Sequence, residues 1–232
     1  MSRLSATILA LCVCFWAVDS AAWHDETHLA VARAAGYAKW YNATGADMAK
    51  LKAGRTEQHN HYVNNRTGTV VTAEAVLRQA GRYNTIEPRG HLYGAILASV
   101  RDYMGAKAEG KYGEYHLGFA AHYLGDLSMP LHNTEYDAFN RKNHAKIDGM
   151  VDAGILERPG RIETYPVTVR SEADLAREVA RVANLARELG ERIRAEKRLP
   201  TEEEAYAQLG HSASLLKAVI VYTEAPRLAP RG

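Results

Sequence analysis

The chain has 232 residues, a formal net charge of +2 at pH 7 and 47% hydrophobic residues. A net charge this close to zero argues against a dedicated nucleic-acid-binding protein. The length suits a single domain with a sizeable hydrophobic core.

Residues 1–22 have the pattern of a secretory signal peptide. Arg3 precedes an apolar run that is too short to span a bilayer, and a small-residue cleavage site follows that run. Both cysteines, Cys12 and Cys14, lie in this segment. The processed domain, residues 23–232, is therefore expected to have no disulfide and no thiolate metal ligand. We expect a soluble monomer without a transmembrane segment, either secreted or periplasmic.

Helical periodicity dominates residues 23–232, and alternating strand patterns are scarce. Helices are expected, in chain order, over residues 27–41, 73–81, 91–105, 112–127, 139–155, 172–198 and 201–224, with polar irregular segments at 55–71 and 154–170. Thr27 is the expected N-terminal cap of the first helix, and Thr201 with Glu204 matches a capping box at the start of the last. The predicted fold is all-α, a single multi-helical domain of roughly eight helices.

The most informative segment runs from His122 to Asp148. It contains two H-x-x-x-D pairs, His122–Asp126 and His144–Asp148, and His132 lies between them. Residues four apart share one face of a helix, so each pair can present an imidazole and a carboxylate to one metal ion. An ionised Asp126 inside an otherwise apolar helix is costly unless it is paired or metal-bound. So many nitrogen and oxygen ligands in one short segment indicate a cluster of zinc ions rather than a single ion.

The expected N-terminus of the processed chain adds a further candidate ligand. Cleavage after Ala22 gives Trp23 a free α-amino group, which can chelate one ion together with the Trp23 carbonyl oxygen. An α-amino group has a pKa of about 7.7–8.0, so zinc can displace its proton at neutral pH. His28 follows on the first helical turn and can bind the same ion.

Together these residues resemble the zinc-dependent phospholipase C family and its relatives, the three-zinc single-strand nucleases. The matching motifs, in order, are W-x4-H (Trp23, His28), A-D (Asp47), H-Y (His61), HYLGD-x3-P-L-H (His122, Asp126, His132) and H-x3-D (His144, Asp148). The resemblance implies three zinc ions in a cleft between helices. Its ligand sets are Asp47, His61, His122 and Asp126 for the first ion, His132, His144 and Asp148 for the second, and Trp23, His28 and Asp126, which bridges to the first, for the third.

Two assignments remain open within this resemblance. Asp47 is either a ligand alone or a ligand that also accepts a proton from the attacking water, which would make it the catalytic base. His59 competes with His61 for the first ion. We prefer His61 because Tyr62 follows it and the relatives carry an aromatic residue there.

The substrate also has alternatives. The short interval between His132 and His144 resembles the phospholipase branch, whereas Asp148 and the W-x4-H motif resemble the nucleases. Candidate substrate-binding residues are Glu26, Lys50 and Tyr62. We expect a phosphodiester hydrolase of the phospholipase C type, in which a zinc-activated water cleaves a phospholipid to diacylglycerol and a phosphorylated headgroup. The alternatives are a nuclease acting on single-stranded DNA or RNA and a non-catalytic, zinc-stabilised helical binding module.

Overall fold

The computed structural model describes residues 25–151 and 154–225. Within these ranges the chain forms nine α-helices and five short 3-10 helices, and no strand occurs there. The predicted all-α, single-domain fold is therefore confirmed. The predicted signal peptide and Trp23 lie outside the described residues.

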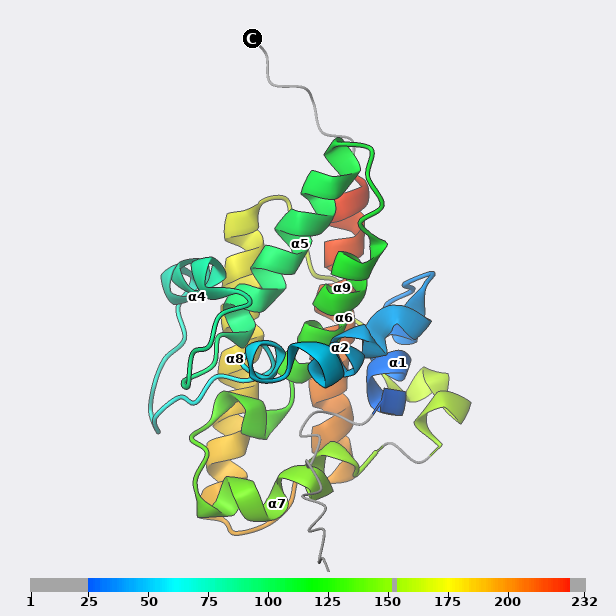
Figure 1. Cartoon of the computed structure of the whole chain (residues 1–232). Coiled ribbons are helices and arrows are strands. Elements are labelled where there is room, and N and C mark those ends of the chain that lie inside the picture. The colour runs from blue at the N-terminus through cyan, green and yellow to red at the C-terminus, as the bar shows by residue number, and fades with distance from the viewer. Residues whose placement is uncertain (1–24, 152–153, 226–232) are drawn as a thin grey trace, which may run out of the picture.

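The helices follow one another along the chain, and the longest connections are residues 59–72 between α3 and α4 and residues 162–171 before α8 (Figure 1). The α-helices are α1 (Asp25–Ala34), α2 (Gly45–Ala53), α3 (Arg55–Gln58), α4 (Ala73–Gln79), α5 (Leu92–Ala108), α6 (Glu114–Leu127), α7 (Ala138–Asp148), α8 (Glu172–Ala195) and α9 (Glu202–Glu224). The 3-10 helices are η1 (Trp40–Thr44), η2 (Ala80–Arg82), η3 (Pro130–Asn133), η4 (Ile155–Glu157) and η5 (Pro159–Arg161).

Helix α6 is the central element of the fold. It contacts α1, α2, α5, α8 and α9, and it lies among these helices in Figure 1. After its first turn the α6 sequence is almost entirely apolar or small, and a helix that is hydrophobic on all sides is buried. Its polar residues His122 and Asp126 are consequently held in the interior with no exposed surface.

Capping residues fix the ends of the long outer helices. Ser171 accepts a hydrogen bond from the Asp174 amide at the start of α8. At the start of α9 the predicted capping box is confirmed, because the Thr201 hydroxyl accepts from the Glu204 amide and the Glu204 carboxylate accepts from the Thr201 amide. Each cap satisfies amide groups that have no partner within the helix. None of the helices in the described ranges is both long and apolar enough to cross a membrane.

Several details of the predicted helices are wrong. The first helix ends at Ala34, because Gly36 turns the chain with a φ of 78°, and Thr27 lies inside α1 rather than at its start. The helix expected over 139–155 stops at Asp148, with Gly149 as its C-terminal cap. Helix α2 and the one-turn α3 were not predicted, because both are too short for a clear hydrophobic period.

Candidate metal centre

The fold brings eight of the nine predicted metal ligands into one buried region. They come from α1, α2, α6, η3, α7 and the turn after α3. Three sets of residues each have ligand atoms that lie within 4.8 Å of one another. The sets are His28, Asp47 and His122; His61, His122 and Asp126; and His132, His144 and Asp148. The ninth predicted ligand, Trp23, lies outside the described residues.

Asp47, His61, His122 and Asp126, which we call the His61 group, lie close together. His61 Nδ1 lies 2.8 Å from Asp126 Oδ2 and 3.8 Å from Asp47 Oδ1. His122 Nε2 lies 3.3 Å from Asp126 Oδ2, and 3.5 Å from Asp47 Oδ1. The two ring nitrogens are 3.2 Å apart. Zinc bonds of about 2.0–2.1 Å in a tetrahedron place the ligand atoms about 3.3 Å apart, so the spacing fits one ion.

His132, His144 and Asp148, which we call the His144 group, form a second set. His144 Nε2 lies 3.2 Å from His132 Nε2, and 3.4 Å from Asp148 Oδ2. These separations match the same tetrahedral spacing of about 3.3 Å. Three protein ligands leave one position of a four-coordinate ion for water or substrate, as in catalytic zinc sites.

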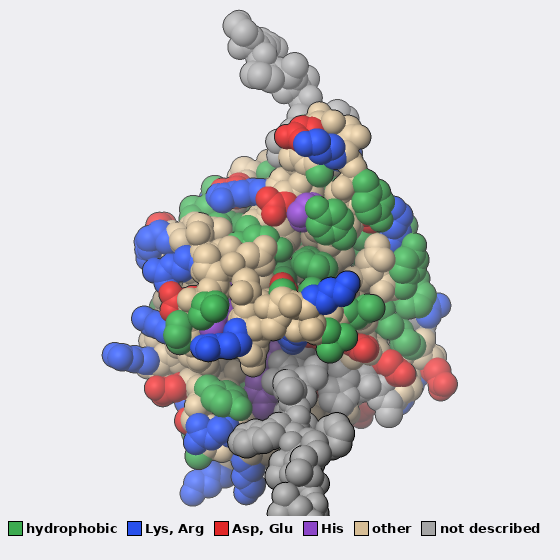
Figure 2. All heavy atoms as spheres, in the orientation of Figure 1, with side chains coloured by type: hydrophobic (Ala, Val, Ile, Leu, Met, Phe, Trp, Pro, Cys, Tyr) green, Lys and Arg blue, Asp and Glu red, His purple; other side chains and the backbone are tan. Residues whose placement is uncertain are grey.

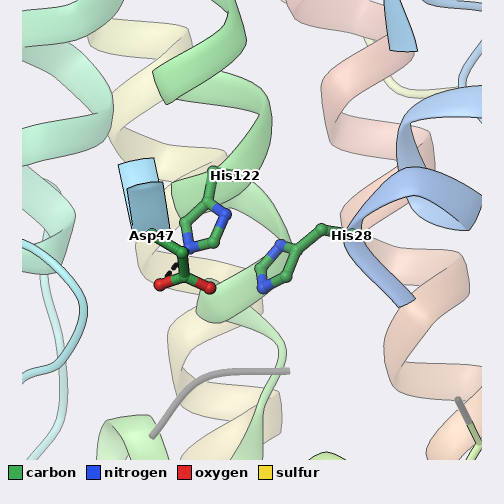
Figure 3. Close-up of side chains that lie close together, drawn as sticks. All are labelled: His28, Asp47 and His122. Atoms are coloured by element: carbon green, nitrogen blue, oxygen red, sulfur yellow. Dashed lines mark ion pairs between the residues drawn. The ribbon is translucent and has the colours of Figure 1, made fainter. Parts of the chain in front are cut away.

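Asp126 lies between the groups. Its Oδ2 atom faces the His61 group, whereas its Oδ1 atom lies 3.4 Å from His28 Nε2, and 3.3 Å from His132 Nδ1. This orientation allows the bridging role that the resemblance implies for Asp126. In Figure 3, His28 from α1, His122 from α6 and Asp47 from α2 point into the same space, and the rings of His28 and His122 stack at 3.7 Å.

Two of the histidines have a hydrogen-bond acceptor behind the ring. The Ala43 carbonyl lies 2.7 Å from His122 Nδ1, and Asn140 Oδ1 lies 2.6 Å from His144 Nδ1. In both rings the protonated nitrogen is thereby directed away from the cluster, and Nε2 faces the other ligands. Such outer partners are typical of metal-binding histidines because they fix the tautomer and the ring orientation.

The charges in the cluster are strongly coupled. Burial alone would lower the pKa of His122, but the carboxylates of Asp47 and Asp126 raise it to about 9. Burial and the neighbouring His122 lower the pKa of His28 to about 4. Burial, with Asp126 nearby, raises the pKa of Asp148 well above its ordinary value. The histidines around Asp126 hold its pKa well below the ordinary value, and a cation bound beside Asp148 would favour ionisation of that carboxylate as well.

Several buried atoms of the cluster have no hydrogen-bond partner among the residues that the structure describes. They are His28 Nε2, Asp126 Oδ1, His132 Nδ1 and both carboxylate oxygens of Asp148. Buried polar atoms without partners are costly, and a bound cation satisfies them together. Imidazole and carboxylate donors without thiolate suit zinc and other borderline divalent ions. The residues present therefore fit a metal centre.

The candidate substrate-binding residues lie in different surroundings. Lys50 Nζ is 2.5 Å from Asp47 Oδ1, so it lies beside the His61 group. Tyr62 is half-buried and packs edge-on against His59 at 6.0 Å, whereas Glu26 is exposed on the first turn of α1. His59 Nδ1 accepts the Glu87 amide instead of joining the cluster, and this leaves His61 as the histidine that faces the other ligands.

Glu57 is a buried residue of this region that the sequence interpretation missed. Its side chain is 3% exposed, and its Oε1 atom lies 3.3 Å from His61 Nε2. The E-x-x-x-H spacing of Glu57 and His61 was the available signal. Because the segment was expected to be irregular, four-residue spacing carried no meaning there.

Comparison with known proteins leaves the family open. No protein-family model and no curated protein matches the chain.

Proposed function

We propose that the protein is a zinc-dependent phosphodiester hydrolase of the phospholipase C type, exported from the cell, with three zinc ions. The observation that carries the proposal is the set of near-tetrahedral spacings in the His61 group, together with acceptors behind the histidine rings. A purely structural ion also fits such a set. The shared Asp126 and the second, three-ligand group favour catalysis, because hydrolysis of phosphate esters uses neighbouring ions with an open position.

Asp47 lies at the edge of the cluster that is nearest to solvent. Its side chain is 13% exposed, whereas the other carboxylates, Asp126 and Asp148, have no exposed surface. A carboxylate that reaches solvent can bind an ion with one oxygen and accept a proton from water with the other. When bound, the zinc ions would supply an acidic water and a positive charge for the phosphate oxygens. Lys50, beside Asp47, adds a positive charge at the same edge.

The surface charge also favours an anionic substrate. Helix α7 contributes His144 and Asp148, and its exposed charged residues are all basic: Arg141, Lys142 and Lys146. In Figure 2, Lys and Arg side chains are frequent on the lower left of this face, where α7 lies in Figure 1. Positive charge near a binding site attracts phosphate-containing substrates.

A single-strand nuclease is the second candidate, and a specific observation supports it. Tyr62 is half-buried next to His61, and the 53% exposed Tyr136 has its ring centre 6.4 Å from that of His144. Aromatic rings close to a metal cluster can stack on nucleobases. The same rings can contact an acyl chain or a headgroup, so the phospholipid remains our first choice.

Paired assays on one preparation of the processed, untagged, zinc-loaded protein test the proposal. Phosphatidylcholine and single-stranded DNA are the two substrates. We expect phospholipid hydrolysis, and activity on DNA alone would replace the first candidate with the second. Asp47→Asn should abolish most of the activity while the fold survives. Asp102→Asn is the matched control, because Asp102 also neighbours a histidine, His116, at 3.9 Å but is 48% exposed and outside the cluster.

If neither substrate is hydrolysed, the non-catalytic binding module is favoured. In that case Asp47→Asn should lower the melting temperature of the zinc-loaded protein, and no rate would be available to lose. Zinc content per chain, measured on the same preparation, separates this result from a failure to load the metal.

A further inference from the structure

Glu57 is an acidic residue in the interior that the proposed chemistry does not use. It lies on α3, and only 2% of the residue is exposed. Burial of an isolated carboxylate is expensive, so a retained one requires donors around it. Glu57 has them: the Tyr123 hydroxyl donates to Oε1 at 2.5 Å, and Asn60 Nδ2 donates to Oε2 at 3.1 Å.

These donors are themselves held in place. Asn60 Oδ1 lies 2.8 Å from His91 Nε2, and Asn60 Nδ2 is also within 3.0 Å of Asn84 Oδ1. Tyr123 is fully buried on α6, directly after His122. The Glu57 carboxylate is thus fixed from two sides by groups that belong to different segments of the chain.

The remaining contact of Glu57 is with a predicted metal ligand. Oε1 lies 3.3 Å from His61 Nε2, while His61 Nδ1 faces Asp126 and Asp47 on the opposite side of the ring. An imidazole with one nitrogen in a metal group must carry its proton on the other nitrogen. Glu57 is the acceptor placed to receive that proton.

We propose that Glu57 is a positioning residue for His61, holding the imidazole in the Nε2-protonated form so that Nδ1 binds the metal ion of the His61 group. The inference rests on the metal site of the proposed function. It adds that metal binding by the His61 group depends on a carboxylate that is not itself a ligand. Loss of a carboxylate partner of this kind typically weakens metal binding by about 10- to 100-fold.

Glu57→Gln tests this role, because glutamine keeps the shape and removes the charge. Zinc affinity is measured by competition with a chromophoric chelator on the full-length processed protein. We expect the His61 group to bind zinc about 10- to 100-fold more weakly, with the affinity of the His144 group unchanged. Glu114→Gln is the matched control, because Glu114 also accepts a tyrosine hydroxyl, that of Tyr37 at 2.7 Å, but contacts no residue of the cluster.

A merely structural role for Glu57 predicts a different result. The melting temperature of the metal-free variant would then fall, and any loss of zinc affinity would be shared by both groups. Equal affinity of Glu57→Gln and the wild type at the His61 group would also overturn the proposal.

A measurement on the wild type keeps the proposal testable if Glu57→Gln does not fold. Nitrogen-15 NMR of the histidine rings in the zinc-loaded protein reports which His61 nitrogen carries the proton. We expect a protonated Nε2, and a protonated Nδ1 would overturn the proposal. If wild-type protein binds no zinc at all, the proposed function fails as well. If wild-type protein binds zinc and hydrolyses its substrate but Glu57→Gln matches it, only the role of Glu57 fails.

Discussion

The close approach of Gly125 to His28 allows a sharp test of the metal centre. Gly125 lies on α6 between His122 and Asp126, and a Cβ atom at this position would be 2.5 Å from His28 Nδ1 and 2.9 Å from its Cε1. Ordinary contacts of a Cβ atom begin at 3.4 Å. Gly125→Ala therefore forces the fully buried His28 ring to move by roughly 1 Å, if contacts are to return to ordinary packing distances.

The expected effects on stability and on metal binding differ in size. In a helix, alanine raises the free energy of unfolding by about 1 kcal/mol relative to glycine, whereas overpacking a core lowers it by about 1–3 kcal/mol. The net loss in unfolding free energy is then about 0–2 kcal/mol, or roughly 0–8 °C in melting temperature for a chain of this size. Metal bonds tolerate displacements of only about 0.2 Å. The shift should therefore remove His28 as a ligand while the fold survives.

The assay is zinc content per chain after equilibrium with excess zinc and removal of the free metal. We expect the wild type to hold three ions and Gly125→Ala to hold two. Gly105→Ala on α5 is the matched control, because nothing lies within 4 Å of its added Cβ atom. That variant should keep three ions, and its free energy of unfolding should rise by up to about 1 kcal/mol. Wild-type zinc content and affinity in Gly125→Ala would refute the assignment of His28 as a ligand.

Three further predictions concern the whole fold. Removal of zinc by a chelator should lower the melting temperature, measured by calorimetry. For each site, the loss should be roughly 8–16 °C if the free zinc concentration was about 1,000 times the dissociation constant. An unchanged transition would contradict a metal centre. Thr201→Ala removes the hydrogen bond to the Glu204 amide and should cost about 1 kcal/mol, measured by urea unfolding; a cost below about 0.3 kcal/mol would contradict the capping box. Hydrogen bonds from Arg198 lower the pKa of Glu204 from 4.5 to about 2. The ionised group therefore stabilises the fold above pH 4.5, and this contribution is lost as the pH falls towards 2. The difference in unfolding free energy between the wild type and Glu204→Gln should shrink over that range, and a constant difference would contradict the ion pair.

The helical fold and the residues that gather in the candidate metal centre could be predicted because their signals are local. A run of apolar residues at helical spacing gave α6, and the four-residue spacing placed His122 and Asp126 on one face of it. The capping box of α9 was visible as Thr201 and Glu204. Such patterns depend on neighbours within one or two turns, which the sequence displays directly.

The supporting contacts could not be predicted because they join segments far apart in the chain. The Ala43 carbonyl that orients His122 is 79 residues away from it, and a backbone carbonyl has no sequence signature. Gly125 looked like an ordinary small residue of α6 until His28 of α1 was placed against it. Glu57 lay in a segment expected to be irregular, so its spacing to His61 carried no information before α3 was known.

The two principal metal groups differ in charge, and that difference bears on where a phosphate would bind. The His61 group has two carboxylates, Asp47 and Asp126, which would neutralise a divalent ion, with Glu57 adding a further negative charge behind it. The His144 group has one carboxylate, Asp148, and so would leave a net positive charge of about one with the same ion. The basic side chains of α7 lie on the same helix as His144. Both the donor set and the surface charge therefore favour the approach of an anionic phosphate from the α7 side, with Asp47 at the solvent-reaching edge of the neighbouring group.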